Sequence, residues 1–213
     1  MKLFIKKAKI EIATRIDRIN LKKYSEAVRK KVPAFFAPPP VKENHMISKK
    51  LEEAINHQIN RELFSEYYYL SMASYFNSTG LSGFENFFLV QVEEERFHAM
   101  KMYRFLNERG GRVFLKEIEA PKTEFNSPLE VFELAYDHER LVSSLINSLM
   151  DLAIQENDHA AKRHLDWFVE EQVEEEASME TILNKLKLVK GEGHGLLMMD
   201  NELAQRVFTP PVK

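Results

Sequence analysis

Cysteine is absent from all 213 residues of the chain. Its absence excludes disulfide bonds, thiolate zinc sites, iron–sulfur clusters and a thiol nucleophile, so any metal chemistry must rest on oxygen and imidazole ligands. Glycine and proline together account for only 15 residues, whereas Asp, Glu, Lys and Arg make up 30% of the chain. This balance is typical of long helices and predicts an all-α fold.

Long apolar runs are also missing from the sequence. No stretch of about 18 apolar residues occurs, which disfavours a membrane-spanning helix. The first 30 residues lack the continuous apolar stretch and the small-residue cleavage site of a secretory signal. We therefore expect a soluble, cytoplasmic protein.

Charge is distributed unevenly along the chain. Residues 1–45 carry 12 Lys or Arg against 4 Asp or Glu, whereas the remaining residues carry 18 against 29. Between the two parts, Pro33, Pro38, Pro39 and Pro40 forbid a helix and favour a stiff, extended connector. We predict a basic N-terminal extension with a Pro-rich connector over residues 1–45 and a second domain over residues 46–213.

The extension has several possible roles. Ile12, Ile16 and Ile19 would share one face of a helix over residues 2–31, with Lys and Arg around them. Such a helix could bind an anionic membrane surface, nucleic acid or a partner groove, and its partner is unknown. The alternatives are a disordered tail or a translated leader upstream of a true start at Met46.

Capping and stop residues divide the second domain into four long helices and a short last one. Ser, Asp and Asn favour helix starts, Pro favours the first turn, and Gly favours the position just past the end. We expect helices from Ser48 to about Asn77, Ser82 to Gly110, Ser127 to about Asn157, Asp158 to about Lys190, and Met198 to Val207. The roughly 15 residues between the second and third helices are long enough to run back along a bundle. The sequence therefore predicts a four-helix bundle with a long crossover between helices 2 and 3 and a short fifth C-terminal helix.

On each long helix, one line of residues is expected to face the inside of the bundle, and we call this line the seam. Each seam is apolar at both ends and polar at its centre. Steps of alternating three and four residues place apolar side chains at both ends of every seam. The polar residues at the four centres are Gln58, Glu62 and Ser65, then Gln91, Glu95 and His98, then Glu139, and finally Gln172 and Glu175. A single acid of this kind is usually a side chain that reaches out to solvent, but four at one height are hard to explain in that way.

Buried carboxylates at one height repel one another and need cations to neutralise them. No Lys or Arg stands in the seams to supply that charge. A bound divalent metal satisfies the requirement, and carboxylates with one imidazole suit iron or manganese better than zinc or copper. The pattern therefore predicts a metal centre inside the bundle.

At these residues the chain resembles a known family. From Met46 to about residue 206 it is similar to a non-haem ferritin of prokaryotic type, within the ferritin-like di-iron proteins, which hold metal between the helices of a bundle. The similarity is carried by residues 60–65 with Tyr69, residues 93–98, residues 136–139 and residues 167–176. Any one Glu-x-x-His motif is weak evidence, but the set is specific.

The resemblance implies a di-iron ferroxidase centre with two irons per subunit. Glu62, Glu95 and His98 would hold one iron, and Glu95, Glu139 and Glu175 would hold the other, so that Glu95 bridges them. Gln172 would lie at the second iron without a charge, and Tyr69 would donate a hydrogen bond or an electron nearby. A possible third iron site matches Glu94, Glu171, Glu174 and Glu175, although an acidic run is also typical of a solvated helix face.

The chain departs from related di-iron families at two positions. Gln172 and Glu175 stand where a symmetric centre would have Glu-x-x-His, which argues against bacterioferritin, rubrerythrin and ribonucleotide reductase. Arg96 follows Glu95 where bacterioferritins carry a haem-ligating Met, so no haem is expected. The remaining histidines of the second domain are interpreted as surface residues or as supports of the site without a catalytic role: His57, His138, His159, His164 and His194.

The resemblance implies iron storage and detoxification. The protein would oxidise ferrous iron with dioxygen and store ferric mineral inside a hollow homo-oligomeric shell, a 24-mer whose last short helix lines a symmetry axis. One rival is a DNA-protecting mini-ferritin, suggested by the basic extension, but that family builds its iron site between subunits. The other is a structural carrier shell with a degenerate site, which the complete ligand set opposes.

Overall fold

The computed structural model of the chain describes residues 47–191 and 193–210. The predictions made for residues 1–45, including the basic extension, its connector and the domain boundary, lie outside the described residues. They remain predictions.

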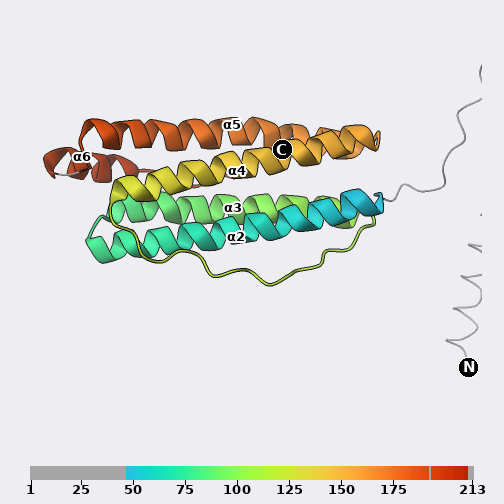
Figure 1. The fold of residues 1–213 in the computed structure, drawn as a ribbon, viewed down its shortest axis with the longest axis horizontal. Helices are drawn as coiled ribbons and strands as arrows, with labels where there is room; N and C mark the ends of the chain where they lie inside the picture. Colours follow the sequence, from blue (N-terminus) through green and yellow to red (C-terminus); the bar gives the residue numbers. More distant parts are fainter. Residues whose placement is uncertain (1–46, 192, 211–213) are drawn as a thin grey trace, which may run out of the picture. The chain divides into compact units, whose positions relative to one another are not determined.

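Four long helices lie side by side and form a bundle, as predicted (Figure 1). The helices are α2 (Lys49–Thr79), α3 (Ser82–Glu108), α4 (Pro128–Gln155) and α5 (His159–Leu188). Each helix runs antiparallel to the next one joined to it by a short loop, so α2 packs mainly against α3 and α4 mainly against α5. No strand occurs within residues 47–191 and 193–210.

The helix ends follow the local signals in the sequence. The Ser48 hydroxyl accepts a hydrogen bond from the Leu51 backbone N–H, and the Ser127 hydroxyl accepts one from Glu130. Asp158 caps α5 by accepting from the Ala161 N–H. Side-chain oxygens at these positions satisfy backbone donors that the first helical turn leaves without partners.

The crossover between α3 and α4 runs the length of the bundle along α2 (Figure 1). Three polar side chains of α2, spaced by four residues, accept hydrogen bonds from backbone N–H groups of the crossover that are spaced by two. Four helical residues rise about 6 Å and two extended residues span about 6.6 Å, so the two repeats match. The pairs are Glu52 with Arg112, Asn56 with Phe114 and Asn60 with Lys116, at 2.9, 2.6 and 2.8 Å.

The short last helix corrects the expected range. It is α6 (Gly193–Leu203), which begins five residues before the predicted Met198 and ends four residues before Val207. Asp200 of α6 accepts hydrogen bonds from the backbone N–H groups of Gly83 and Phe84 and so caps α3. A β-carbon at Gly83 would lie 1.6 Å from the Asp200 carbonyl oxygen, so the close approach of α6 requires glycine there. Tertiary contact with α3, which no local signal reveals, therefore sets the position of α6.

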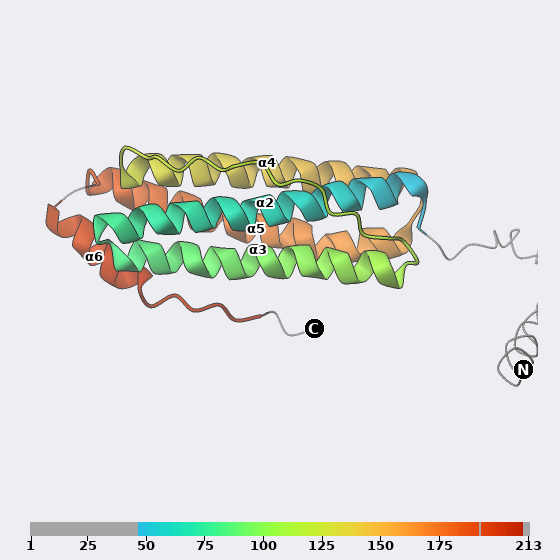
Figure 2. The same cartoon turned by 90° about the horizontal axis from the view of Figure 1, so that it is seen from below.

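After α6 the chain turns back and runs along α3 (Figure 2). The Asn86 side-chain amide donates to the carbonyl oxygens of Leu203, 3.1 Å away, and Arg206, 2.9 Å away. These two bonds tie the end of α6 and the residues just after it to α3. We refer to residues 204–210 as the C-terminal segment.

The apolar core forms two clusters, one toward each end of the bundle. The first contains stacked rings of Phe76, Phe84 and Phe88, and the second contains Leu51, Ile55 and Leu165. The seam prediction holds for every residue named above at the polar centres, which are all buried. Three-and-four spacing from Glu95 and His98 leads through Met102 to Phe105 and so predicts a buried Phe105, but this ring is only partly buried and stacks on His164. Leu106 takes the core position in its place.

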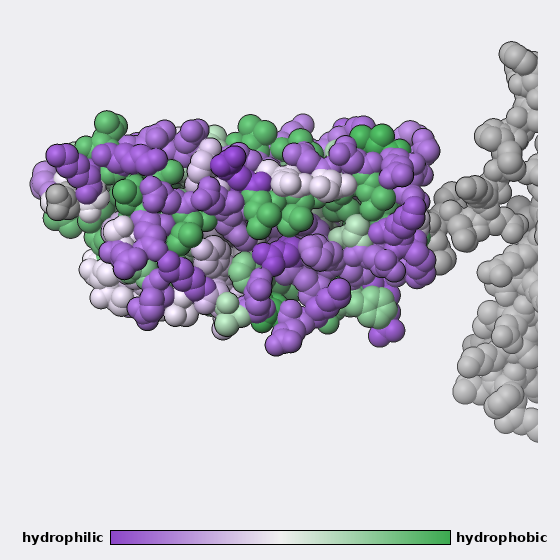
Figure 3. Space-filling view, viewed as in Figure 1, coloured by the Kyte–Doolittle hydropathy of each residue, from purple (hydrophilic) through white to green (hydrophobic). Residues whose placement is uncertain are grey.

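The face of the bundle in Figure 3 is largely hydrophilic, with several hydrophobic patches between the polar side chains. Within the described residues, no helix combines the length and the apolar composition needed to cross a membrane.

Candidate metal centre

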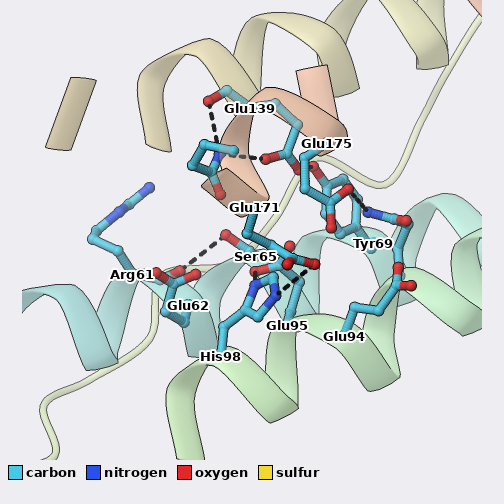
Figure 4. A network of polar contacts seen from close by, with 12 residues as sticks. Arg61, Glu62, Ser65, Tyr69, Glu94, Glu95, His98, Glu139, Glu171 and Glu175 are labelled. Atoms are coloured by element: carbon cyan, nitrogen blue, oxygen red, sulfur yellow. Dashed lines mark hydrogen bonds and ion pairs between the residues drawn. The ribbon is translucent and has the colours of Figure 1, made fainter. Parts of the chain in front are cut away.

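The polar seam residues of all four long helices meet between the two apolar clusters (Figure 4). Helix α2 contributes Glu62 and Tyr69, and α3 contributes Glu95 and His98. Helix α4 contributes Glu139. Glu175 and Gln172 come from α5, and all seven side chains are buried. The sequence therefore places these residues correctly at one level of the bundle.

Glu62, Glu95 and His98 form a compact group of potential metal ligands. Their ligand atoms all lie within 4.8 Å of one another. The His98 Nδ1 atom is 3.7 Å from Oε2 of Glu95. Oε2 of Glu62 and Oε2 of Glu95 are buried without a hydrogen-bond partner. Buried carboxylate oxygens are rarely left without partners, so two of them beside an imidazole suit a cation.

Glu139 is held by two neutral donors. The Tyr69 hydroxyl donates a short hydrogen bond to Oε1 of Glu139, and the Gln172 side-chain amide donates to Oε2 at 3.1 Å. These bonds fix both carboxylate oxygens on the side of the centre opposite α3. Tyr69 and Gln172 thus both reach the centre through Glu139.

The expected second set of ligands, Glu95, Glu139 and Glu175, does not form an equally compact group within the described residues. Instead, the ligand atoms of Glu175 lie within 4.8 Å of His98 and Glu171. The Gln91 side-chain amide donates to Oε2 of Glu175 at 3.0 Å. Glu139 and Glu175 therefore each accept from a neutral donor of their own, whereas Oε2 of Glu95 has no hydrogen-bond partner.

The carboxylates strongly perturb the protonation of the centre. Burial, strengthened by the negative charge of Glu175, raises the pKa of Glu139 to about 8. Burial also raises the pKa of Glu95 well above its usual range. Burial alone would lower the pKa of His98, but the carboxylates of Glu171 and Glu95 outweigh it and raise the pKa well above its usual value. The centre therefore favours bound positive charge, whether protons or metal cations.

The residues expected for a third site are only partly brought together. Glu171 and Glu175 lie beside His98, but Glu174 is exposed and belongs to no compact group of ligands within the described residues. Glu94 is paired with Arg206 of the C-terminal segment, with Nη2 2.7 Å from Oε2. Burial, strengthened by Glu175, raises the pKa of Glu94 to about 7, and Arg206 opposes that rise.

Sequence reasoning gave no role to two glutamines that support the centre. The Gln58 amide donates to Oε1 of Glu62 at 2.8 Å, and Gln91 donates to Glu175. Gln58 stands four residues before its partner Glu62, so a polar residue one helical turn before an expected ligand is a signal that could have identified it. Gln91 bonds a ligand on another helix, which spacing along the chain does not reveal. Arg206 gave no such signal, because it follows the last helix in an irregular segment.

The other histidines lie either beside the centre or nearer the surface. His138 is buried beside the centre, where its Nε2 lies 2.8 Å from the Ser65 hydroxyl. Burial lowers the pKa of His138 to about 4, with Arg61 adding to the effect, so it stays neutral. His164 is partly buried and stacks on Phe105, whereas the side chains of His57, His159 and His194 are exposed.

A four-helix bundle with a buried carboxylate and histidine centre defines a ferritin-like protein. The family model for the ferritin-like domain matches residues 52–189. The chain belongs to the ferritin family.

Individual relatives agree with this assignment. The chain is 40% identical over 163 residues to a bacterial non-heme ferritin of Staphylococcus aureus, covering 76% of this chain and 98% of that protein. A bacterial non-heme ferritin of Staphylococcus saprophyticus is also 40% identical over 163 residues, with the same coverage. Among solved structures, an open pore ferritin of the hyperthermophilic archaeon Archaeoglobus fulgidus is 51% identical with a TM-score of 0.75, covering 76% of this chain and 99% of that one. A closed form of the same ferritin, engineered by mutagenesis, is 52% identical with a TM-score of 0.75 and the same coverage.

Proposed function

We propose that the protein is a ferroxidase that oxidises ferrous iron with dioxygen at the centre between its four helices and stores the ferric product. The observation that carries this proposal is the buried group of Glu62, Glu95 and His98, with two carboxylate oxygens that have no hydrogen-bond partner. Hard oxygen ligands with one imidazole suit ferrous and ferric iron.

We propose separate roles for the ligands and for the residues that support them. Glu62 and His98 would bind one ferrous ion, Glu139 and Glu175 would bind a second, and Glu95 would bind both. Tyr69 and Gln172 would hold Glu139 in position through the hydrogen bonds they already make. Two ferrous ions each supply one electron, and one dioxygen accepts both, so holding the ions as a pair is the main contribution of the protein.

A possible third site would take iron near Glu171 and Glu175, with Glu94 and Glu174 as further candidates. Glu171 and Glu175 already lie beside His98, which supports their part of this proposal. We keep all four residues as candidates because Glu94 is one residue from Glu95 and Glu174 lines a groove next to Arg206.

Storage requires an enclosed volume, which one bundle cannot supply. We therefore propose that subunits assemble into a hollow homo-oligomer, a 24-mer as expected for the family. Tyr67 and Leu70 on α2 are 48% and 44% exposed and line a groove of about 380 Å³ with Ile118 of the crossover. Contact between copies would cover these apolar side chains, as obligate interfaces do.

The test is to add ferrous iron in air to the purified, metal-free protein. We expect a rapid rise in ultraviolet absorbance that saturates at about two ferrous ions per subunit, followed by iron that elutes with the protein in size-exclusion chromatography at the size of a large shell. Oxidation no faster than in buffer, or ferric iron that precipitates apart from the protein, would contradict the proposal.

A further inference from the structure

The C-terminal segment touches the metal centre through a single ion pair. Arg206 meets Glu94, the residue just before Glu95, and the two side chains are only 24% and 19% exposed. A pair so shielded from water interacts more strongly than an exposed one. The Glu94 carboxylate also lies close to Glu175 within the acidic cluster (Figure 4).

The remaining anchors of the segment are few and all lie on α3. The Arg206 guanidinium stands 4.4 Å from the centre of the Phe87 ring and donates to the Phe87 carbonyl oxygen at 3.4 Å. The Phe208 ring centre lies 6.1 Å from that of Phe97. Arg206 therefore makes most of the side-chain contacts that hold residues 204–210 against the bundle.

We propose that Arg206 and a metal cation compete for Glu94, so that the C-terminal segment is a strap that loosens when metal binds at this side of the centre. Nη2 of Arg206 lies 2.7 Å from Oε2 of Glu94. A cation that bound the same oxygen would be repelled by the positive charge of Arg206. If metal weakens the docking of the strap, the docked strap weakens metal binding by the same factor. This inference rests on the proposed metal-binding function.

Titration of the full-length, metal-free protein with Zn²⁺ by calorimetry tests the competition without any oxidation. Arg206→Gln removes the competing charge and should tighten the weakest Zn²⁺-binding step by about fivefold or more. Lys185→Gln is the matched control, because it also removes one positive charge, from an exposed ion pair with Glu202 at the same end of the molecule. It should leave that step unchanged.

A double-mutant cycle separates competition from a general change in electrostatic field. In a protein that carries Glu94→Gln, the further change Arg206→Gln should no longer affect Zn²⁺ affinity, because the shared carboxylate is gone. Arg206→Lys keeps the charge but loses the planar fork, so its affinity should fall between those of the parent and Arg206→Gln. An equal gain in Lys185→Gln, or an undiminished gain in the Glu94→Gln protein, would overturn the proposal.

Hydrogen exchange measures the strap itself. The backbone N–H groups of Ala204, Gln205 and Arg206 donate to carbonyl oxygens of α6. The Asn86 amide holds this turn against α3, so exchange in a peptide containing these residues reports how firmly the turn is held. Saturating Zn²⁺ should speed exchange in residues 204–210 of the parent, and Arg206→Gln should exchange rapidly with or without Zn²⁺. Zn²⁺ binding with unchanged exchange would overturn the strap and leave the proposed function standing. No Zn²⁺ binding at all would overturn the competition at Glu94, whereas the proposed function stands or falls on the ferrous-oxidation assay.

Discussion

The two apolar clusters of the bundle and the polar layer between them follow opposite physical rules. In the clusters, rings such as Phe76, Phe84 and Phe88 bury almost all of their surface and stabilise the fold without needing a polar partner. In the polar layer, Glu95 and Glu139 are equally buried, but their burial is unfavourable and raises both pKa values. The apolar ends of the bundle therefore supply stability that offsets the unfavourable burial of the acids in the middle. Substitutions in the two regions should therefore separate stability from chemistry.

The largest expected effect is on stability and lies in the apolar region. Phe76→Ala removes a fully buried ring that stacks on Phe84 and Phe88, so it should lower the free energy of unfolding by about 3–5 kcal/mol. The folded fraction should still oxidise ferrous iron at the parental rate per subunit. Chemical denaturation measures the first effect and stopped-flow absorbance the second. Loss of oxidation in fully folded Phe76→Ala protein would show that the apolar region also controls the chemistry of the polar layer.

The next effect is on chemistry and lies in the polar layer. Glu95→Gln keeps the side-chain volume but removes the charge that both irons would share, so the rapid phase of ferrous oxidation should fall at least about tenfold. Stability of the metal-free protein should be unchanged or slightly higher, because one of several repelling carboxylates is gone. Iron should raise the melting temperature of this variant less than that of the parent. A destabilised metal-free protein with normal early oxidation would instead assign Glu95 a purely structural role.

A smaller effect concerns the pH dependence of the metal-free protein, kept free of metal by a chelator. Glu139 has a pKa of about 8 when folded, above its ordinary value near 4.5, so the folded state binds more protons between these limits. The resulting stabilisation is complete below pH about 4.5 and is lost as pH rises through about 8. We expect the melting temperature to fall by a few degrees between pH 5 and pH 8, and Glu139→Gln to flatten that fall. An equally steep fall in both proteins would show that other groups control it.

The smallest expected effect comes from the part of the chain outside both regions. Because every ferritin-like element lies beyond Met46, a protein that begins there should assemble and oxidise ferrous iron at near the full-length rate. Size-exclusion chromatography and the oxidation assay check this expectation. A protein that stays monomeric or loses iron uptake would show that the predicted boundary at residues 45 and 46 is wrong.

The sequence alone was sufficient for the main features of the fold and the centre. Ser48, Ser127 and Asp158 cap their helices through neighbours three residues away, so the signal is local and readable. The seam residues were also predictable, because residues at fixed intervals lie on the same face of a straight helix. Four seams that turn polar at the same level of the bundle require one shared partner, such as a metal. The family resemblance then supplied the expected roles of those residues as iron ligands.

Tertiary structure decided the features that depend on contacts distant in sequence. The bounds of α6 depend on the bonds from Gly83 to Asp200 and from Asn86 to Leu203, which each span 117 residues of chain. The Arg206–Glu94 pair spans 112 residues. Phe105 stacks on the His164 ring, and Leu106 fills the core position that spacing assigns to Phe105. The periodicity of apolar residues tells which face one helix turns toward its neighbours. It does not tell which residue each side chain contacts, because packing and hydrogen bonding depend on distance in space and not on distance along the chain.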